Sequence, residues 1–267
     1  MYPGKIRSEI SAIQSAPTSL HYTMRVTSLD PSITRLTGSR GGVDGTNNPI
    51  QTAFEVGQPI WYFRGYKYEG VDPETGAAKI KKMNDDKVIS DADMTYIGKA
   101  IPDYVYGLTL NLAYKGLDFT VFGSGVGGND IFTVFYRADS PMRNSLKYFY
   151  DNAWTPTNKG ASMPDPKAVA NDWHFWGSSA SLFSGSYFKF KQIQLGYTVP
   201  AAITRRVLIS NLRCYVSLDD FFTLTRYPGA DPETATSTKN NDASGSGFDN
   251  GTYPQSKKVT FGLSITL

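Results

Sequence analysis

The segment Tyr104–Lys115 carries the clearest alternation of apolar and polar residues in the chain. A period of two predicts a β-strand with one apolar face. Tyrosine stands at both ends of that face and leucine in the middle, an order typical of a strand that faces lipid, because tyrosine favours the headgroup level. The residues that we expect to face lipid are Tyr104, Tyr106, Leu108, Leu110, Leu112 and Tyr114.

Several other segments have the same alternation. Leu117–Val121 follows a tight turn at Lys115 and Gly116, which predicts a hairpin. Further strand candidates bring the number to about seven, and they are Leu20–Leu29, Phe54–Tyr66, Tyr187–Val199, Leu212–Leu224 and the C-terminal segment. The apolar face expected for the C-terminal strand consists of Val259, Phe261, Leu263, Ile265 and Leu267.

The connections between these strands differ greatly in length. Three of them, at about residues 67–103, 126–186 and 225–257, are very long, whereas the turn at 115–116 is very short. Compact soluble domains rarely contain several irregular loops of this length. Outer-membrane barrels combine short periplasmic turns with long extracellular loops. The spacing therefore favours a transmembrane β-barrel.

Composition narrows the function classes. Aromatic residues make up 13% of the chain and charged residues only 19%, and the formal charge of +3 gives no reason to expect a nucleic-acid partner. A single cysteine, Cys214, excludes a disulfide framework, and two distant histidines exclude a histidine-rich metal centre. Residues 1–5 lack the apolar stretch of a secretory signal, so none is expected.

The C-terminal third resembles a known family. Residues 185–200, GSYFKFKQIQLGYTVP, are similar to the "SYLRLKNITLGYTLP" segment of SusC-like TonB-dependent transporters, also called the SusC/RagA family, from the Bacteroidota outer membrane. The segments 212–233 and 250–255 then resemble "LRLYVS…NLFTFTKYPGYDPE" and "YGTYPQ" in the same order. Further collinear similarities lie at 57–70, 97–102, 114–118 and 154–158. Together they cover about residues 20 to 267.

This resemblance implies an all-β fold, in which residues 20–267 form about seven C-terminal strands of a 22-stranded transmembrane barrel with long extracellular loops. Residues 1–19 stay an unassigned N-terminal segment. Open strand edges are not tolerated in lipid, so the plug and the remaining strands must come from a second polypeptide unless the chain is a fragment.

The resemblance also implies a function. The family takes up oligosaccharides or oligopeptides through the bacterial outer membrane, together with a SusD-like surface lipoprotein and powered through TonB. It implies neither an enzymatic activity nor a cofactor.

Two other function classes remain as alternatives. A soluble β-sandwich that binds carbohydrate would also have alternating strands and clustered aromatic residues. A detergent-free solubility test separates it from a membrane protein. A secreted enzyme that cleaves glycans would need two converging carboxylates, and no pair in the sequence has spacing that argues for this.

Four aromatic residues of one long loop are candidate contacts to the substrate or to the lipoprotein: Trp154, Trp173, Phe175 and Trp176. Their rings could stack on sugars or pack against peptide side chains. The alternative, which we prefer, is that they hold the loop to itself or to a neighbouring protein.

Three other motifs suggest chemistry but have simpler interpretations. Asp219 and Asp220 could form an acid–base pair, but neighbours on a regular strand point to opposite faces. The acidic stretch Asn84–Asp93 could bind a cation, although Lys82 and Lys87 favour a solvated turn. The glycines of Gly123–Gly128 lack the context of a phosphate-binding loop and are expected in a turn.

Overall fold

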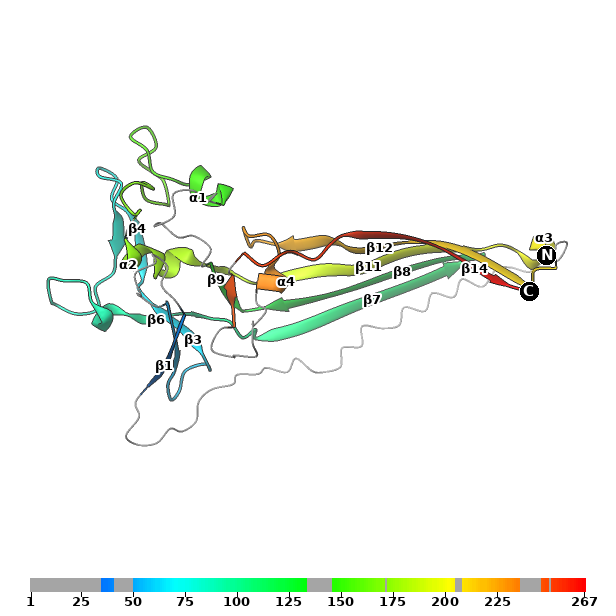
Figure 1. Cartoon of the computed structure of the whole chain (residues 1–267), viewed down its shortest axis with the longest axis horizontal. Coiled ribbons are helices and arrows are strands. Elements are labelled where there is room, and N and C mark those ends of the chain that lie inside the picture. Colours follow the sequence, from blue (N-terminus) through cyan, green and yellow to red (C-terminus); the bar gives the residue numbers. More distant parts are fainter. Residues whose placement is uncertain are drawn as a thin grey trace.

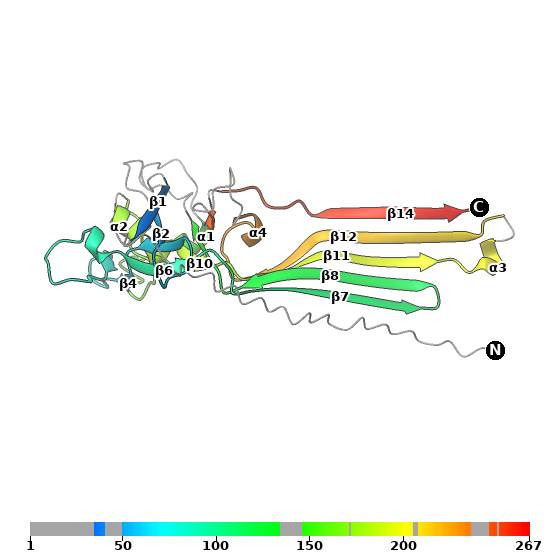
Figure 2. The same ribbon diagram turned by 90° about the horizontal axis from the view of Figure 1, so that it is seen from below.

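The computed structural model describes residues 35–40, 50–133, 146–170, 172–204, 208–235, 246–249 and 251–267. It has two parts, a long five-stranded sheet and a body of loops and short elements at one end of that sheet (Figure 1). We call the second part the outer body. The C-terminus lies at the opposite end of the sheet, where the connections are short (Figure 2).

The long sheet is antiparallel throughout, in the order β14-β12-β11-β8-β7. The predicted alternation accounts for all five strands, and their bounds agree with the expected ones within two residues, except that β8 extends six residues beyond Val121. Residues Lys115 and Gly116 connect β7 to β8 with positive φ angles of 46° and 87°, as a two-residue hairpin turn requires. The strands are β7 (Tyr104–Tyr114), β8 (Leu117–Gly127), β11 (Tyr187–Thr198), β12 (Asn211–Thr225) and β14 (Lys258–Thr266).

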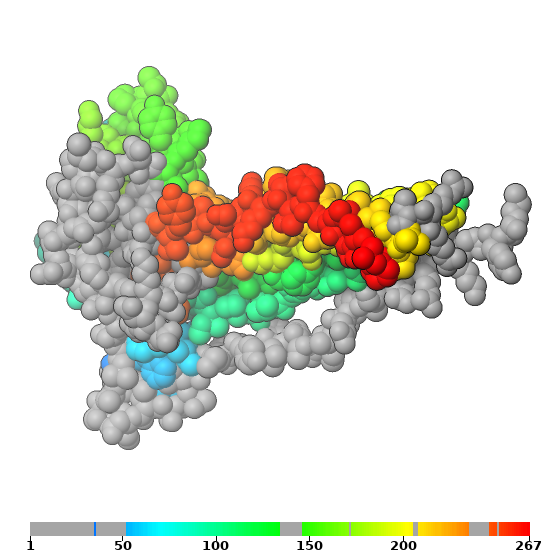
Figure 3. Space-filling model, turned by 45° about the vertical axis from the view of Figure 1, so that its right-hand side comes forward, coloured from blue at the N-terminus to red at the C-terminus, as the bar shows by residue number. Residues whose placement is uncertain are grey.

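One face of this sheet is apolar and uncovered. Phe261 is 81% exposed and Leu195 is 48% exposed, and no second sheet packs on this face within the described ranges. β14 runs along the surface beside β12 without another described element over it in the space-filling view (Figure 3). A soluble β-sandwich buries such a face against a second sheet. The described architecture is therefore not that of a sandwich. We call the sheet of β7, β8, β11, β12 and β14 the wall.

Of the expected strands, one is not described by the structure and another is not part of the five-stranded sheet. Leu20–Leu29 lies outside the described residues. Phe54–Tyr66 is not one strand, because the chain turns sharply at Gly57 and Trp61, which have positive φ angles. It is divided between β2 (Ile50–Phe54) and β3 (Tyr62–Gly65), which pair in a small sheet with β1 (Leu36–Arg40) and β6 (Thr95–Lys99). The described part of the wall thus has five strands where the sequence suggested about seven.

The outer body holds most of the buried apolar side chains. One cluster consists of Phe63, Ala100, Phe132 and Phe248, and a second consists of Phe149, Met163, Val169, Phe175 and Ala180. Its further strands are β4 (Tyr68–Val71), β5 (Ala78–Ile80), β9 (Asp130–Thr133), β10 (Leu182–Ser184) and β13 (Phe248–Asp249). Its helical turns are η1 (Asp91–Asp93), α1 (Lys147–Asp151), α2 (Trp173–Trp176) and η2 (Ser179–Ser181).

Two short helices lie next to the wall, α4 (Pro232–Ala235) at the end near the outer body and α3 (Ala201–Thr204) at the far end (Figure 2). None of the described helices is both long and apolar enough to cross a membrane.

The glycines of Gly123–Gly128 are strand residues, apart from Gly128, and this corrects the expectation of a turn. They leave room for aromatic rings on the apolar face. A side chain at Gly125 would collide with the Tyr106 ring and with the Tyr187 carbonyl oxygen, and one at Gly127 would collide with the Tyr104 ring. Aromatic rings that cover strand glycines stabilise a sheet locally.

Candidate functional site

The face of the wall opposite the apolar one is mostly polar, although Val105 and Phe122 also lie on it. In its middle row, Thr120 Oγ1 donates a hydrogen bond of 2.9 Å to Asn111 Oδ1. This row consists of Asn111, Thr120, Gln194, Ser217 and Thr260, which the strand registers place side by side. It offers amide and hydroxyl groups without a charge.

An ion pair crosses the polar face near the short turns. Arg213 Nε donates to Asp118 Oδ2 at 3.0 Å, and the Arg213 guanidinium also lies 5.0 Å from the centre of the Tyr215 ring. Asp118 is on β8 and Arg213 on β12, so the pair spans β11. Gly196 of β11 makes this possible, because a side chain there would collide with both partners.

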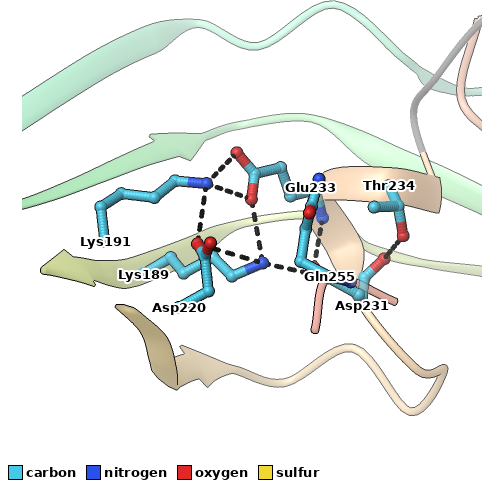
Figure 4. A network of polar contacts seen from close by, with 7 residues as sticks. All are labelled: Lys189, Lys191, Asp220, Asp231, Glu233, Thr234 and Gln255. Carbon is cyan, nitrogen blue, oxygen red and sulfur yellow. Dashed lines mark hydrogen bonds and ion pairs between the residues drawn. The ribbon is translucent and has the colours of Figure 1, made fainter. Parts of the chain in front are cut away.

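A larger ion cluster lies at the other end of the polar face, beside α4, and Figure 4 shows its side chains. We call it the loop-root cluster, and it comprises Lys189, Lys191, Asp220, Asp231 and Glu233. Lys189 Nζ lies 2.7 Å from Asp231 Oδ2 and 3.0 Å from Glu233 Oε2, and its side chain is only 2% exposed. Lys191 Nζ lies 2.6 Å from Glu233 Oε2 and 3.2 Å from Asp220 Oδ1. Each ammonium group thus has two close carboxylate partners, and Lys189 Nζ also lies 4.0 Å from Asp220 Oδ1.

A β-bulge brings these groups together. The pairing of β11 with both neighbours shifts between Phe190 and Gln192, and Lys191 is the extra residue relative to β8. On β12 the shift leaves out both Asp220, whose φ angle is +52°, and Phe221. Bulges redirect side chains. Here the bulge lets Lys189 and Lys191 both contact carboxylates on the polar face.

Asp231 joins both arms of the loop between β12 and β14 to the wall. It accepts hydrogen bonds from the backbone N–H of Glu233 at 3.0 Å and of Gln255 at 3.2 Å, besides its ion pair with Lys189. Burial raises the pKa of the Asp231 carboxyl, but the Lys189 ammonium and the two N–H donors outweigh it, so the pKa is lowered overall. The carboxylate therefore stays charged. A second link between the arms is the buried hydrogen bond that Tyr227 donates to Asp249.

Asp219 and Asp220 do not point to opposite faces, contrary to the expectation for a regular strand. Ser217 Oγ donates to Asp219 Oδ1 at 2.7 Å, and Asp220 contacts Lys191, both on the polar face. The bulge is the reason, because alternation fails where an extra residue is inserted. The carboxylate of Asp219 contacts Ser217, whereas that of Asp220 contacts Lys191.

The four aromatic candidates lie in the outer body and differ in exposure. Phe175 is 1% exposed within the apolar core, and Trp154 is 9% exposed with its Nε1 donating to the Pro73 carbonyl at 3.0 Å. Trp176 is half-buried and donates from Nε1 to the Val169 carbonyl at 2.8 Å. Trp173, also half-buried, stacks on the His174 ring with 4.1 Å between ring centres. Only Trp173 and Trp176 therefore retain appreciable surface for a ligand.

The acidic stretch Asn84–Asp93 forms a turn that uses its own oxygens. The Asp93 carboxylate accepts hydrogen bonds from the N–H groups of Met83 at 2.8 Å and Ser90 at 2.9 Å, which lower its pKa. Asn84 and Asp86 accept further N–H groups of the turn. No cluster of three or more histidine, cysteine, aspartate or glutamate side chains suited to a metal ion occurs in the part of the chain that the structure describes.

Comparison with known proteins points to one family. The chain is 31% identical over 227 residues to TonB-dependent receptor P3 of Formosa agariphila, which covers 78% of this chain and 22% of the relative. It is 26% identical to TonB-dependent receptor SusC of Bacteroides thetaiotaomicron, over 83% of this chain and 21% of SusC. The chain thus spans about a fifth of the length of these curated relatives. No family profile matches it.

The fold agrees with this relationship. The RagAB peptide importer in its "open-open" state superposes with a TM-score of 0.68 at 22% identity, covering 91% of this chain and 25% of that one. The "closed-closed" state gives a TM-score of 0.67. At this level of identity the superposition establishes the fold. Sequence and fold together identify the chain as the C-terminal portion of a SusC-like TonB-dependent receptor.

Proposed function

We propose that this chain supplies the closing wall and part of the outer loops of an outer-membrane importer of nutrients. The observation that carries the proposal is the difference between the two faces of the wall: one is apolar across five long strands and is not covered by any described element, and the other is mostly polar. A barrel in lipid needs both faces, one toward the acyl chains and one toward the interior. A soluble sandwich also has an apolar and a polar face on each sheet, but it buries the apolar one against a second sheet.

The two faces have separate tasks in this proposal. The apolar residues of β7 and β14 contact lipid, among them Leu108, Leu110, Phe261 and Leu263. The polar rows line the interior, where amide and hydroxyl groups hold water and substrate through hydrogen bonds. β7 and β14 are the edges of the wall among the described strands, and the backbone groups on their outer sides must bond to further strands because lipid offers no alternative partner.

The substrates in this proposal are oligosaccharides or oligopeptides, delivered by a SusD-like surface lipoprotein and moved with energy transmitted through TonB. Support comes from the relatives, which are named TonB-dependent receptors, and from RagAB, which is named a peptide importer. The plug and the other strands come from outside the 267 residues. Trp173 and Trp176 are the aromatic side chains that we propose for contact with substrate or lipoprotein.

An uptake assay tests this function. Cells that produce all the strands of the barrel should take up a labelled oligosaccharide or oligopeptide, and removal of β14 by a stop codon after residue 257 should abolish uptake and the folded barrel together. Uptake that persists without β14 would contradict the proposal. So would recovery of the chain as a monomer from a lysate without detergent, the result expected of a soluble binding module.

A further inference from the structure

The outer body contains an open pocket of about 290 Å³ that lies apart from the polar face of the wall. Its hydrogen-bonding residues are Lys67, Lys81, Thr95 and Ser179, and its walls are formed by Tyr96, Ile97 and Met83. Carboxylate side chains are absent from this lining. Its volume lies at the lower end of the range for small-molecule sites.

The two lysines stand directly opposite each other. Tyr68 of β4 pairs with Ile80 of β5, and one position further out the Lys81 N–H donates to the Lys67 carbonyl at 2.8 Å. Like charges at opposed positions destabilise a hairpin. An anion between the two ammonium groups would convert this repulsion into attraction.

Neither lysine forms a close ion pair with a carboxylate of the described residues. The nearest carboxylate oxygen to Lys81 Nζ is Glu69 Oε1 at 4.0 Å, with both side chains about half exposed. Lys67 has no carboxylate within 4.0 Å among the described residues. By contrast, Lys147 and Lys159 of the same outer body contact Asp151 at 2.5 Å and Glu74 at 2.6 Å. The positive charge of the pocket therefore remains available to a ligand.

The neutral side chains of the pocket add a donor and an apolar wall. Ser179 Oγ accepts the Tyr68 N–H at 3.0 Å, so its own hydrogen is left to donate. Tyr96 and Ile97 are neighbours on β6 and line the same pocket. A ligand group that fits carries oxygen acceptors with negative charge and lies next to an apolar or ring-shaped surface.

We propose that this pocket binds an oxyanion group, a carboxylate or a sulfate, of the transported substrate. The proposal rests on the proposed import function and makes it more specific. The group could belong to an acidic oligosaccharide or to the free C-terminus of a peptide. The two sources share the same chemistry, and binding experiments distinguish them.

The test measures binding to the assembled, detergent-purified transporter that contains this chain. Four probes are used: an oligo-uronate, a neutral oligosaccharide of the same length, a peptide with a free C-terminal carboxylate, and the same peptide amidated. The double substitution Lys67→Met, Lys81→Met should weaken binding of one charged probe about tenfold or more, because hydrogen bonds to charged groups are being lost. The uncharged probe of the same pair, the neutral oligosaccharide or the amidated peptide, should bind the variant and the original protein equally.

Two further variants make the result specific. Lys67→Arg, Lys81→Arg should retain most of the affinity for the charged probe, and Lys147→Met, Lys159→Met should retain all of it with the same loss of total charge. Unchanged affinity of the Lys67→Met, Lys81→Met variant for every charged probe, or an equal loss for charged and neutral probes, would overturn the pocket while leaving the import function intact. Failure of the original protein to bind any of the four probes would contradict both proposals.

Discussion

Replacement of Lys189 by methionine should greatly reduce the amount of folded transporter in the outer membrane. The Lys189 side chain is 2% exposed, and its removal leaves the 6% exposed Asp231 carboxylate without its ion-pair partner. Loss of one partner from a buried charge pair costs about 3–5 kcal/mol. The measurement is the yield of heat-modifiable barrel, together with its unfolding midpoint in urea.

Graded controls separate charge from packing. Lys191→Met should cost less, since Lys191 is 24% exposed and its partner Glu233 keeps its contact with Lys189. Lys189→Met combined with Asp231→Leu and Glu233→Gln should recover part of the yield, because no uncompensated buried charge remains. Equal yields for Lys189→Met and the original chain would show that the loop-root cluster does not secure the wall.

The second prediction concerns the middle of β7, where Leu110 and Asn111 are neighbours on opposite faces. Leu110→Arg should sharply lower the yield of folded barrel, because arginine on the lipid face near the bilayer midplane costs about 2–4 kcal/mol. Asn111→Arg should be tolerated, since its side chain points to the polar interior next to Thr120. Quantitative blots of outer-membrane fractions provide the comparison. Equal yields for the two variants would refute the assignment of faces.

The long strands of the wall were predictable because their side-chain pattern is local. In β7, lipid on one side and water on the other require alternation at every position, so eleven residues suffice to define the strand. The same holds for β11, expected at Tyr187–Val199 and found at Tyr187–Thr198. The bulge in β11 is also visible in the sequence, because the apolar positions are even-numbered at Phe188 and Phe190 and odd-numbered at Ile193.

The outer body was not predictable in the same way, because its contacts are distant in sequence and its strands have only a few residues each. Phe54–Tyr66 has the composition of a strand, yet Gly57 and Trp61 turn the chain into two strands of another sheet. Trp154 is held by Pro73, 81 residues away. No local pattern indicates such a contact.

The polar contacts of the loop-root cluster are equally distant. Lys189 and Asp231 are 42 residues apart, and a lysine in a predicted strand has no local feature that identifies its partner. Two adjacent aspartates within an alternating strand were the available signal. In a regular strand the two side chains would point to opposite faces, but the bulge at Asp220 interrupts that alternation.

The most direct test of the central claim, that this sheet is a wall between lipid and a polar interior, is an accessibility scan of β7 in the assembled transporter. With Cys214 replaced by serine, single cysteines at positions 105 to 113 are spin-labelled, and collisions with oxygen and with a water-soluble nickel complex are measured. Oxygen should be favoured at 108, 110 and 112, and the nickel complex at 107, 109 and 111. Equal access of the nickel complex to both sets of positions would contradict the account.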